Sequence, residues 1–350
     1  MNMLEALQAK PKEKPATKDD RLESLARMSR DLANKASTMT RDEVRFMVDA
    51  YYTIQEHRIA MSSQLRELSR AQEPHAVFTW LASQQELLEN QVRRALDKWT
   101  EADPLASWAK SILGIGPVIS AGLRAHIDTE KVRSYGQIWT FAGLNPTALW
   151  VSTDKATTWI NECLIQRGVK APDGVVVELA AKAFGRNPVN LLRAATTNKD
   201  GEAVKLTAST LAKAISRRPW NESLKTLATY KLGESFVKVS GNDASWYGAY
   251  YRKTKDALIA KNEAGDFKDD AKAKLEKFNI GKDTDAYKAY SIGKLPPAHI
   301  HARARRIVVK LFLSHYFEAG CVIVRGVQPP EPWPIAHGGH VDWVKYTDVS

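Results

Sequence analysis

The sequence predicts an all-α fold, or one that is nearly all-α, and three observations lead to this prediction. Apolar residues recur at intervals of three and four along most of the chain, as they do on one face of a helix. Strings of alternating apolar and polar residues, which are typical of half-buried strands, do not occur. Hydrophobic residues make up 44% of the 350 residues, which is enough to form one or more cores.

The chain divides into six predicted segments. From the N-terminus they are a mobile charged arm (1–39), a helical hairpin or coiled coil (40–103), a helix-hairpin-helix domain (104–150), an inserted helical subdomain (151–219), a C-terminal helical part (220–327) and an extended tail (328–350). The first segment has few large apolar residues, so we expect at most one short helix in it, near Leu22–Ala33.

A long helix should begin after Thr40, because Thr40 and Glu43 have the spacing of a capping box. An apolar stripe follows, and Glu73-Pro74 interrupts it before a second long helix, so the two should form a hairpin. The stripe comprises Phe46, Met47, Ala50, Tyr51, Ile54, Ile59, Met61, Leu65 and Leu68, then Phe78, Leu81, Leu87, Leu88, Val92 and Leu96. Such a stripe suits packing within one chain and homo-oligomer formation equally well.

Further helices are predicted downstream. One should cover Asn221–Gly241, and another, Trp246–Ala260, carries an aromatic stripe that we expect to lie in the core. Pro296-Pro297 should begin a final long helix that Gly320 ends or kinks. A shorter helix is expected over Asp269–Phe278.

Charge and cysteine content narrow the class of protein. The formal net charge of +11 favours a polyanionic partner. The two cysteines form no CxxC pair and indicate no disulfide framework. The sequence shows no signal peptide or membrane span, so we expect a cytoplasmic protein of a bacterial or phage-infected cell that does not act at a membrane.

The segment Ile112–Leu123, ILGIGPVISAGL, has the pattern of a helix-hairpin-helix. Gly114 and Gly116 permit a tight turn, Ile115 can fill the space between two helices, and Pro117 can begin the second helix. Free backbone amides at the turn and the positive end of the helix dipole would then bind a phosphate without reading any base. The predicted DNA-binding residues here are Lys110, Gly114, Ile115, Gly116, Pro117, Ser120 and Arg124. The alternative is a turn that needs glycine only for packing.

The same region resembles the C-terminal domain of DEDD-type insertion-sequence transposases, the IS-one-ten type, which a bridge RNA guides. The resemblance covers about fifty residues and rests on Gly114–Pro117, Ala125–Asp128, Tyr135, Trp139 and Phe141–Pro146. Pro219-Trp220-Asn221 with Leu224-Lys225 resembles the helix that follows in that family. The coiled coil that the family places before this domain would correspond to the helical hairpin at 40–100.

This sequence departs from the family in two ways. Only about one hundred residues precede the hairpin, and they predict helices, so the family's nuclease domain and its four acidic metal ligands have no counterpart. The resemblance also implies a nucleophilic serine after the second block, for which Ser152 is the nearest candidate catalytic residue. The residues around Ser152 differ from the family's, and a helix N-cap is the alternative role.

A second basic element begins the last long helix. Helical spacing places His299, Arg303 and Arg306 on one face, and His301 with Arg305 on another. Arginines at such a position can hold phosphate, and we predict His299, Arg303, Arg305 and Arg306 as DNA-binding residues. The alternatives are a solvated basic face and pairing with Asp283 and Asp285.

Metal binding is a weaker interpretation of the histidines. The candidates are His299, His301, His315, His337 and His340. The two rings of His299-Ile300-His301 should point apart, and no nearby carboxylate completes a set of ligands. We therefore predict no cofactor, with a divalent metal as an open alternative.

These observations favour a DNA-binding, transposase-like protein of phage or mobile-element origin that holds the phosphate backbone largely without sequence specificity. DNA is favoured over RNA as the partner. One rival is a recombinase or nuclease that acts through Ser152 or with a partner supplying acidic metal ligands. The other is an oligomeric protein-interaction scaffold built on the helical hairpin.

Overall fold

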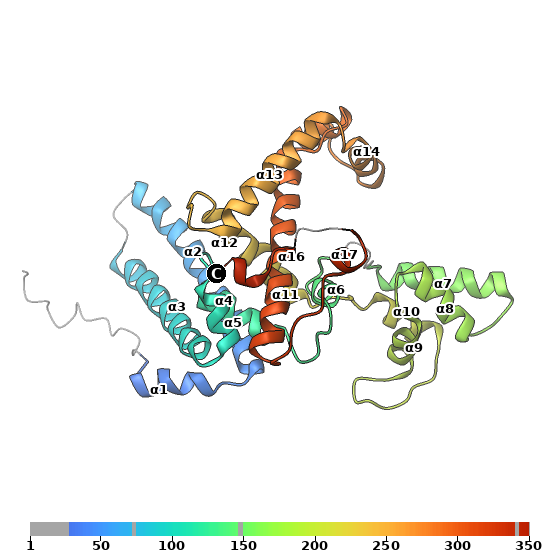
Figure 1. Cartoon of the computed structure of the whole chain (residues 1–350), viewed down its shortest axis with the longest axis horizontal. Coiled ribbons are helices and arrows are strands. Elements are labelled where there is room, and N and C mark those ends of the chain that lie inside the picture. Colours follow the sequence, from blue (N-terminus) through green and yellow to red (C-terminus); the bar gives the residue numbers. More distant parts are fainter. Residues whose placement is uncertain (1–27, 72–74, 146–149, 340–342, 350) are drawn as a thin grey trace, which may run out of the picture. The chain divides into compact units, whose positions relative to one another are not determined.

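The computed structural model describes residues 28–71, 75–145, 150–339 and 343–349. The chain divides into two compact units, 1–102 and 103–350, and each is described by itself. The described residues form helices joined by turns (Figure 1), and the isolated bridge between Thr197 and Ala203 is the one extended pairing among them. The all-α prediction is therefore confirmed. No helix in the described part of the chain is both long enough and apolar enough to cross a membrane.

The first unit contains the predicted helical hairpin. Helices α1 (Arg30–Lys35), α2 (Arg41–Ala71) and α3 (Ala76–Ala102) follow one another, with the 3₁₀ turn η2 (Ala36–Thr38) after α1. Before α2, the Thr40 amide donates to the Glu43 carboxylate (2.6 Å) and the Glu43 amide donates to Thr40 Oγ1 (3.3 Å), which confirms the capping box. The predicted break at Glu73-Pro74 and most of the predicted helix near Leu22 lie outside the described residues.

The α2–α3 pair is packed in its half nearest the start of α2. Glu89 of α3 accepts hydrogen bonds from Tyr51 Oη (3.0 Å) and Gln55 Nε2 (3.1 Å), and its carboxylate pairs with Arg58. Burial, followed by the hydrogen bond to Glu89, raises the pKa of Tyr51 to about 12. Phe46, a member of the predicted apolar stripe, is 72% exposed and takes no part in this packing, whereas Val44 and Val48 are buried.

The second unit is built around α16 (Pro297–Ile323), against which α4, α6, α12 and α13 pack (Figure 1). Aromatic rings fill its centre: Phe312 of α16 lies 5.7 Å from Phe236 and 5.5 Å from Tyr247, measured between ring centroids. Apart from residues 151–219, the helices that precede α16 in this unit are α4 (Pro104–Ser111), α5 (Pro117–His126), α6 (Tyr135–Phe141), α11 (Glu222–Thr226), the π-helical segment η3 (Leu227–Leu232), α12 (Gly233–Lys238), α13 (Trp246–Ala264), α14 (Lys268–Lys277) and α15 (Asp285–Ser291).

Helix α16 begins at Pro297 as predicted, but Gly320 neither ends it nor breaks it. The helix continues to Ile323 through Gly320, which packs against the turn after α5. A Cβ atom at Gly320 would lie 2.7 Å from Thr129 Cγ2, so the absent side chain allows close contact between the two segments. The expected core position of the aromatic stripe on α13 holds for Tyr247 and Tyr251, which are buried.

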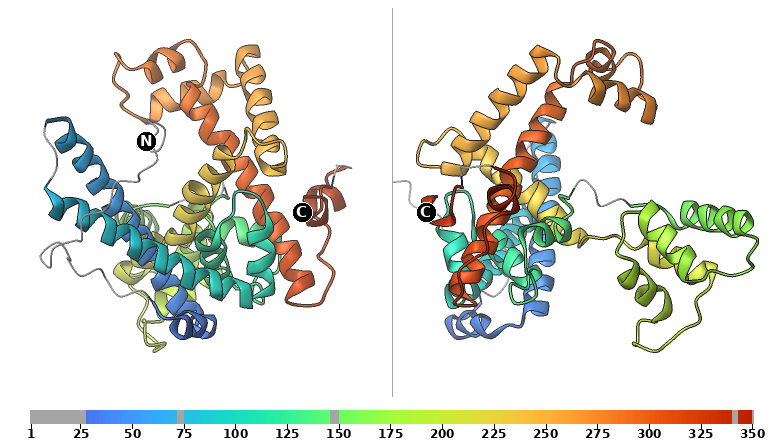
Figure 2. Two further views of the ribbon diagram at one scale, coloured as in Figure 1. Left: turned by 90° about the vertical axis from the view of Figure 1, so that its left-hand side faces the viewer. Right: turned by 45° about the vertical axis from the view of Figure 1, so that its right-hand side comes forward.

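Residues between α6 and α11 form a helical cluster with its own core. Helices α7 (Thr153–Arg167), α8 (Gly174–Ala183), α9 (Pro188–Thr196) and α10 (Ala208–Ser216) make up this cluster, which Figure 2 shows in its right-hand view. Ile160, Val176, Leu191, Leu211 and Ile215 are buried together in its interior. A core of this kind is what a helical subdomain inserted into a larger fold requires.

The segment after α16 contains two short helical turns, α17 (Trp333–Ala336) and the 3₁₀ turn η4 (Tyr346–Asp348), where we expected an extended tail. Three hydrogen bonds hold its end on α16. Glu318 accepts from Trp343 Nε1 (3.0 Å) and the Tyr346 amide (2.9 Å), and His315 Nε2 lies 3.0 Å from the Val344 carbonyl oxygen. We call residues 343–348 the C-terminal strap.

Candidate nucleic-acid interface

The hairpin consists of α4, α5 and the turn between them, and its first glycine is explained by backbone geometry and packing. Gly114 has a φ of +103°, a conformation that L residues rarely adopt. A Cβ atom there would lie 3.1 Å from Val239 Cγ2 and 3.5 Å from the Ser235 carbonyl oxygen, just after and within α12. Ile115 is buried, as expected for the residue that fills the space between the helices.

The second glycine faces open space. Gly116 is exposed, and a Cβ atom built on it meets no atom within 4 Å. It is the N-cap of α5, which begins with Pro117 and has no side-chain cap. The amides of the first turn of α5 are thus not capped by a side chain, at the positive end of the helix dipole. This is the part of the hairpin that an anion can approach.

Two of the predicted hairpin contacts instead hold α4 and α5 together. Ser120 is fully buried, and its hydroxyl donates to the Ala106 carbonyl oxygen at 2.5 Å. Arg124 is 8% exposed, and its Nε lies 2.7 Å from Asp103 Oδ2, while the same carboxylate caps α4. Their burial places both side chains away from the surface, so they do not belong to the exposed part of the turn. Lys110 is half-buried in the last turn of α4.

The second basic element lies at the first half of α16, and its two faces have different surroundings. On one face, His299, Arg303 and Arg306 line a cavity of about 280 Å³ together with Lys274 and Lys277 of α14. We call this the α14–α16 cavity. It brings together the three residues that helical spacing placed on one face, and it adds two lysines that the sequence analysis did not select. The spacing of Lys274 and Lys277 beside Phe278 is the signal that could have identified them.

The other face of α16 is occupied within the fold. Arg305 is 8% exposed, pairs with Glu234 of α12, and stacks 5.2 Å from the centre of the Tyr230 ring. His301 Nε2 lies 3.6 Å from the same carboxylate. A Cβ atom at Gly233 would lie 2.6 Å from Arg305 Cγ, so this glycine makes room for the arginine. Arg305 therefore holds α12 to α16, and its predicted place at a DNA-binding surface is not supported.

The acidic partners of the α16 arginines differ from the expected ones. Arg303 Nη1 lies 2.8 Å from Asp270 Oδ2 of α14, and Arg305 forms an ion pair with Glu234. The alternative of pairing with Asp283 and Asp285 is wrong for both arginines. Arg306 is exposed and forms no ion pair with any described residue.

The pKa values of two groups in this region are lowered by burial first and by neighbouring cations second. Burial lowers the pKa of His299, and the charges of Lys274, Arg306 and Arg303 lower it further against the opposing effect of Asp270. Burial also lowers the pKa of Lys225 of α11, with Arg218 and Arg306 adding repulsion. Arg306 thus lies close enough to both His299 of the α14–α16 cavity and Lys225 to affect their pKa values.

Aromatic rings accompany these cations. Lys225 Nζ lies 4.1 Å from the centre of the Trp220 ring, and Lys310 Nζ of α16 lies 4.6 Å from that of Trp139. The Arg218 guanidinium, which also pairs with Glu222, lies 5.3 Å from the exposed Trp150. We call this set the basic-aromatic band; it comprises Arg218, Lys225, Lys274, Lys277, Arg303, Arg306 and Lys310 with Trp139, Trp150, Trp220 and Phe278.

Ser152, the candidate nucleophile, is the N-cap of α7. Its Oγ accepts the amide hydrogen of Lys155 at 3.4 Å, the capping role that the sequence allowed as an alternative. This hydrogen bond serves the helix, and no histidine or carboxylate is bonded to Ser152 Oγ in the described part of the chain. A nucleophilic serine normally needs such a base.

The histidines of α16 are engaged with tyrosines. Tyr290 Oη lies 3.1 Å from His299 Nδ1, Tyr251 Oη 2.7 Å from His301 Nδ1, and Tyr247 Oη 2.7 Å from His315 Nδ1. The described residues contain no group of three His, Cys, Asp or Glu side chains that could hold a metal ion. His340 lies outside the described residues.

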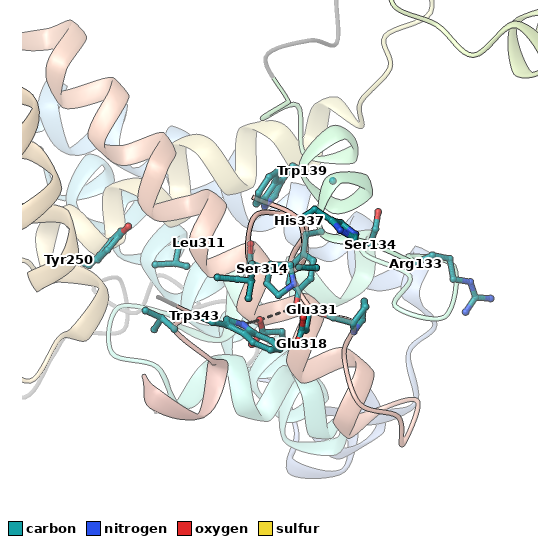
Figure 3. A pocket seen from close by; sticks show the side chains of 17 residues that line it. Arg133, Ser134, Trp139, Tyr250, Leu311, Ser314, Glu318, Glu331, His337 and Trp343 are labelled. Carbon is teal, nitrogen blue, oxygen red and sulfur yellow. Dashed lines mark hydrogen bonds between the residues drawn. The ribbon is translucent and has the colours of Figure 1, made fainter. Parts of the chain in front are cut away.

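A larger and mainly apolar cavity of about 780 Å³ lies between α6, α16 and the chain after α16 (Figure 3). Trp139, Leu311 and Trp343 are among its lining residues. Glu318 also lines it, but its carboxylate already accepts hydrogen bonds from Tyr135, Trp343 and Tyr346. The C-terminal strap thus closes one side of this cavity.

Comparisons with protein-family models, with curated proteins and with solved structures find no match to this chain.

Proposed function

We propose that this chain binds nucleic acid, DNA in particular, through its phosphate backbone and largely without sequence specificity. The observation that carries the proposal is the basic-aromatic band, in which cations lie close to aromatic rings and only Arg218 and Arg303 pair with a carboxylate among the described residues. Cations hold phosphates, and rings of this kind stack on bases that are not paired. Contacts of both kinds are made without reading the sequence of a duplex.

The hairpin supports the same proposal. Gly116 and the first turn of α5 offer backbone amides to an anion without a competing side chain. Together with the resemblance of residues 114–146 to the bridge-RNA-guided transposases, this favours a transposase-like DNA-binding protein of phage or mobile-element origin. The nuclease half of that family is not part of the proposal.

A binding panel tests the proposal directly. The full chain is titrated with single-stranded DNA, duplex DNA, a branched DNA junction and an RNA of matched length, at two salt concentrations. We expect binding to at least one DNA form that weakens steeply as salt rises. No binding to any of the four, or affinity that does not respond to salt, would contradict the proposal.

Two rival functions are tested with the same material. The enzyme rival predicts cleavage or strand transfer of supercoiled or branched DNA, with or without a divalent metal, that Ser152→Ala abolishes. Ser152→Asp is the matched control, because aspartate also caps a helix, and loss of activity in both variants with intact folding would indicate a nucleophile.

The scaffold rival rests on the α2–α3 hairpin. Away from its packed half, α2 and α3 leave large apolar side chains exposed: Ile59, Leu68, Val77, Phe78 and Leu81. An exposed apolar surface on a helical hairpin suits association with a second helical surface. Light scattering of the full chain and of a Phe78→Glu variant tests this: an oligomer that dissociates in the variant supports it.

A further inference from the structure

The α14–α16 cavity combines more positive charge than one internal phosphate of a nucleic acid requires. Four cations line it: Lys274 and Lys277 from α14, and Arg303 and Arg306 from α16. Its one carboxylate, Asp270, is engaged by Arg303 at 2.8 Å. Within the described residues, the two lysines and Arg306 have no carboxylate partner.

Concentrating like charges in one cavity costs free energy unless an anion fills it. At His299, burial is the main cause that lowers the pKa, and the charges of Lys274, Arg306 and Arg303 lower it further. An internal phosphodiester carries one negative charge. A terminal phosphate monoester carries about −1.5 to −2 at neutral pH and presents three oxygens to donors. The cavity's charge is matched better by the monoester.

An aromatic ring at the rim of the cavity is a second group that can contact the ligand. Phe278 is 48% exposed, with Lys274 Nζ 4.9 Å and Lys277 Nζ 5.7 Å from the centre of its ring. A phosphate held by these lysines would therefore lie near an exposed ring on which a terminal base could stack. A cavity of about 280 Å³ is large enough for a phosphate but too small to enclose a whole nucleotide.

Building on the proposed function, we propose that the α14–α16 cavity binds the terminal phosphate monoester of a nucleic-acid strand, with Phe278 stacking on the terminal base. Arg303 and Arg306 would donate to the phosphate oxygens, and Lys274 and Lys277 would supply charge. The chain would then recognise strand ends in addition to holding the backbone along the band.

The test uses the full chain and three short single-stranded DNAs of one sequence, labelled at an internal position: one with a 5′ phosphate, one with a 3′ phosphate and one with neither. We expect at least one phosphorylated strand to bind about tenfold more tightly than the unphosphorylated one, a difference of about 1.4 kcal/mol. Arg306→Gln and Lys277→Gln should remove that preference, because each deletes one charge without burying a group. Both side chains are exposed, so the variants should fold.

Lys272→Gln is the control: it lies on α14, is exposed and does not line the cavity. Phe278→Ala should reduce the preference, because it removes the ring on which the terminal base would stack. Equal binding of all three strands, or a preference that survives Arg306→Gln and Lys277→Gln, overturns this inference and leaves the proposed function intact. No binding of any strand overturns both.

Discussion

The two glycines of the hairpin turn have different roles at the scale of single residues, although the sequence presents them as a pair. Gly114 needs its positive φ and its contact with Val239, whereas Gly116 has ordinary backbone angles and open space around it. The function of the turn can therefore be tested at Gly116 without disturbing the fold.

Gly116→Asp should weaken DNA binding several-fold while raising stability. Aspartate is a better N-cap than glycine by a few tenths of a kcal/mol, so the free energy of unfolding should rise slightly. The same carboxylate would repel a phosphate at the first turn of α5. Urea denaturation and DNA titration measure the two effects, and unchanged affinity would exclude the turn as a phosphate site.

Gly114→Ala is the contrasting change. A residue with a Cβ atom at a φ of +103° is strained and would press on Val239, so the variant should lose about 1–3 kcal/mol of stability. Any loss of DNA binding in this variant would follow from the damaged fold. A Gly114→Ala protein as stable as the parent would show that the turn does not have the described conformation.

Stability should fall as the pH drops through 6.5, because two histidines are held neutral. Burial is the main cause that lowers the pKa of His299 and of His315 below the ordinary value of 6.5. Below pH 6.5 the unfolded chain therefore takes up protons that the folded chain does not, and the free energy of unfolding falls. This fall stops once the pH is below the pKa values that the two histidines have in the folded chain. The difference between the urea midpoints at about pH 7.5 and about pH 5.5 measures this change in stability. His299→Gln should show a smaller difference between the two.

At the scale of elements, the C-terminal strap depends on the buried carboxylate of Glu318. Trp343→Phe keeps an aromatic ring beside the apolar cavity but removes the Nε1 donor that lies 3.0 Å from Glu318. Leaving a buried carboxylate one donor short should cost about 1–3 kcal/mol. Thermal unfolding and limited proteolysis of the tail measure the effect. If the strap of the variant resists proteolysis as well as the strap of the parent protein does, this expectation is wrong.

The elements that the sequence predicted are those whose signals are local. The Thr40–Glu43 cap, the start of α16 at Pro297 and the range of α14 depend on neighbouring residues, and the structure agrees with each. Gly320 shows the limit: its reason is contact with Thr129, almost two hundred residues away in sequence. No local pattern distinguishes such a glycine from one that ends a helix.

The candidate site shows the same limit. Helical spacing grouped His299, Arg303 and Arg306 correctly, because it depends on one helix alone. The sequence predicts a surface position for Arg305, because no residue near it in the sequence shows that it packs against Glu234 and Gly233 of another helix. Lys274 and Lys277 were missed because only the packing of α14 beside α16 brings them to the cavity.

At the scale of the whole molecule, the division between residues 102 and 103 separates the α2–α3 hairpin from the basic-aromatic band. A chain that begins at Asp103 should keep DNA binding, since every member of the band lies in the second unit. It must retain Asp103, because this residue caps α4 and pairs with Arg124. DNA titration of residues 103–350 tests this. Complete loss of binding in a folded fragment would place the interface in the first unit.

The salt dependence of binding counts the phosphates that the molecule contacts. Each phosphate that a cation neutralises releases counterions, so the logarithm of the affinity should fall linearly with that of the salt concentration between about 50 and about 200 mM. Arg306→Gln should reduce the slope of that line by about 1, the change expected when one phosphate contact is lost. Arg306 has no ion pair within the described residues that would compete with a phosphate. Arg305→Gln should leave it unchanged, since Arg305 is already paired with Glu234 and buried. Equal changes in the two variants would mean that net charge alone, rather than the exposed face of α16, attracts the nucleic acid.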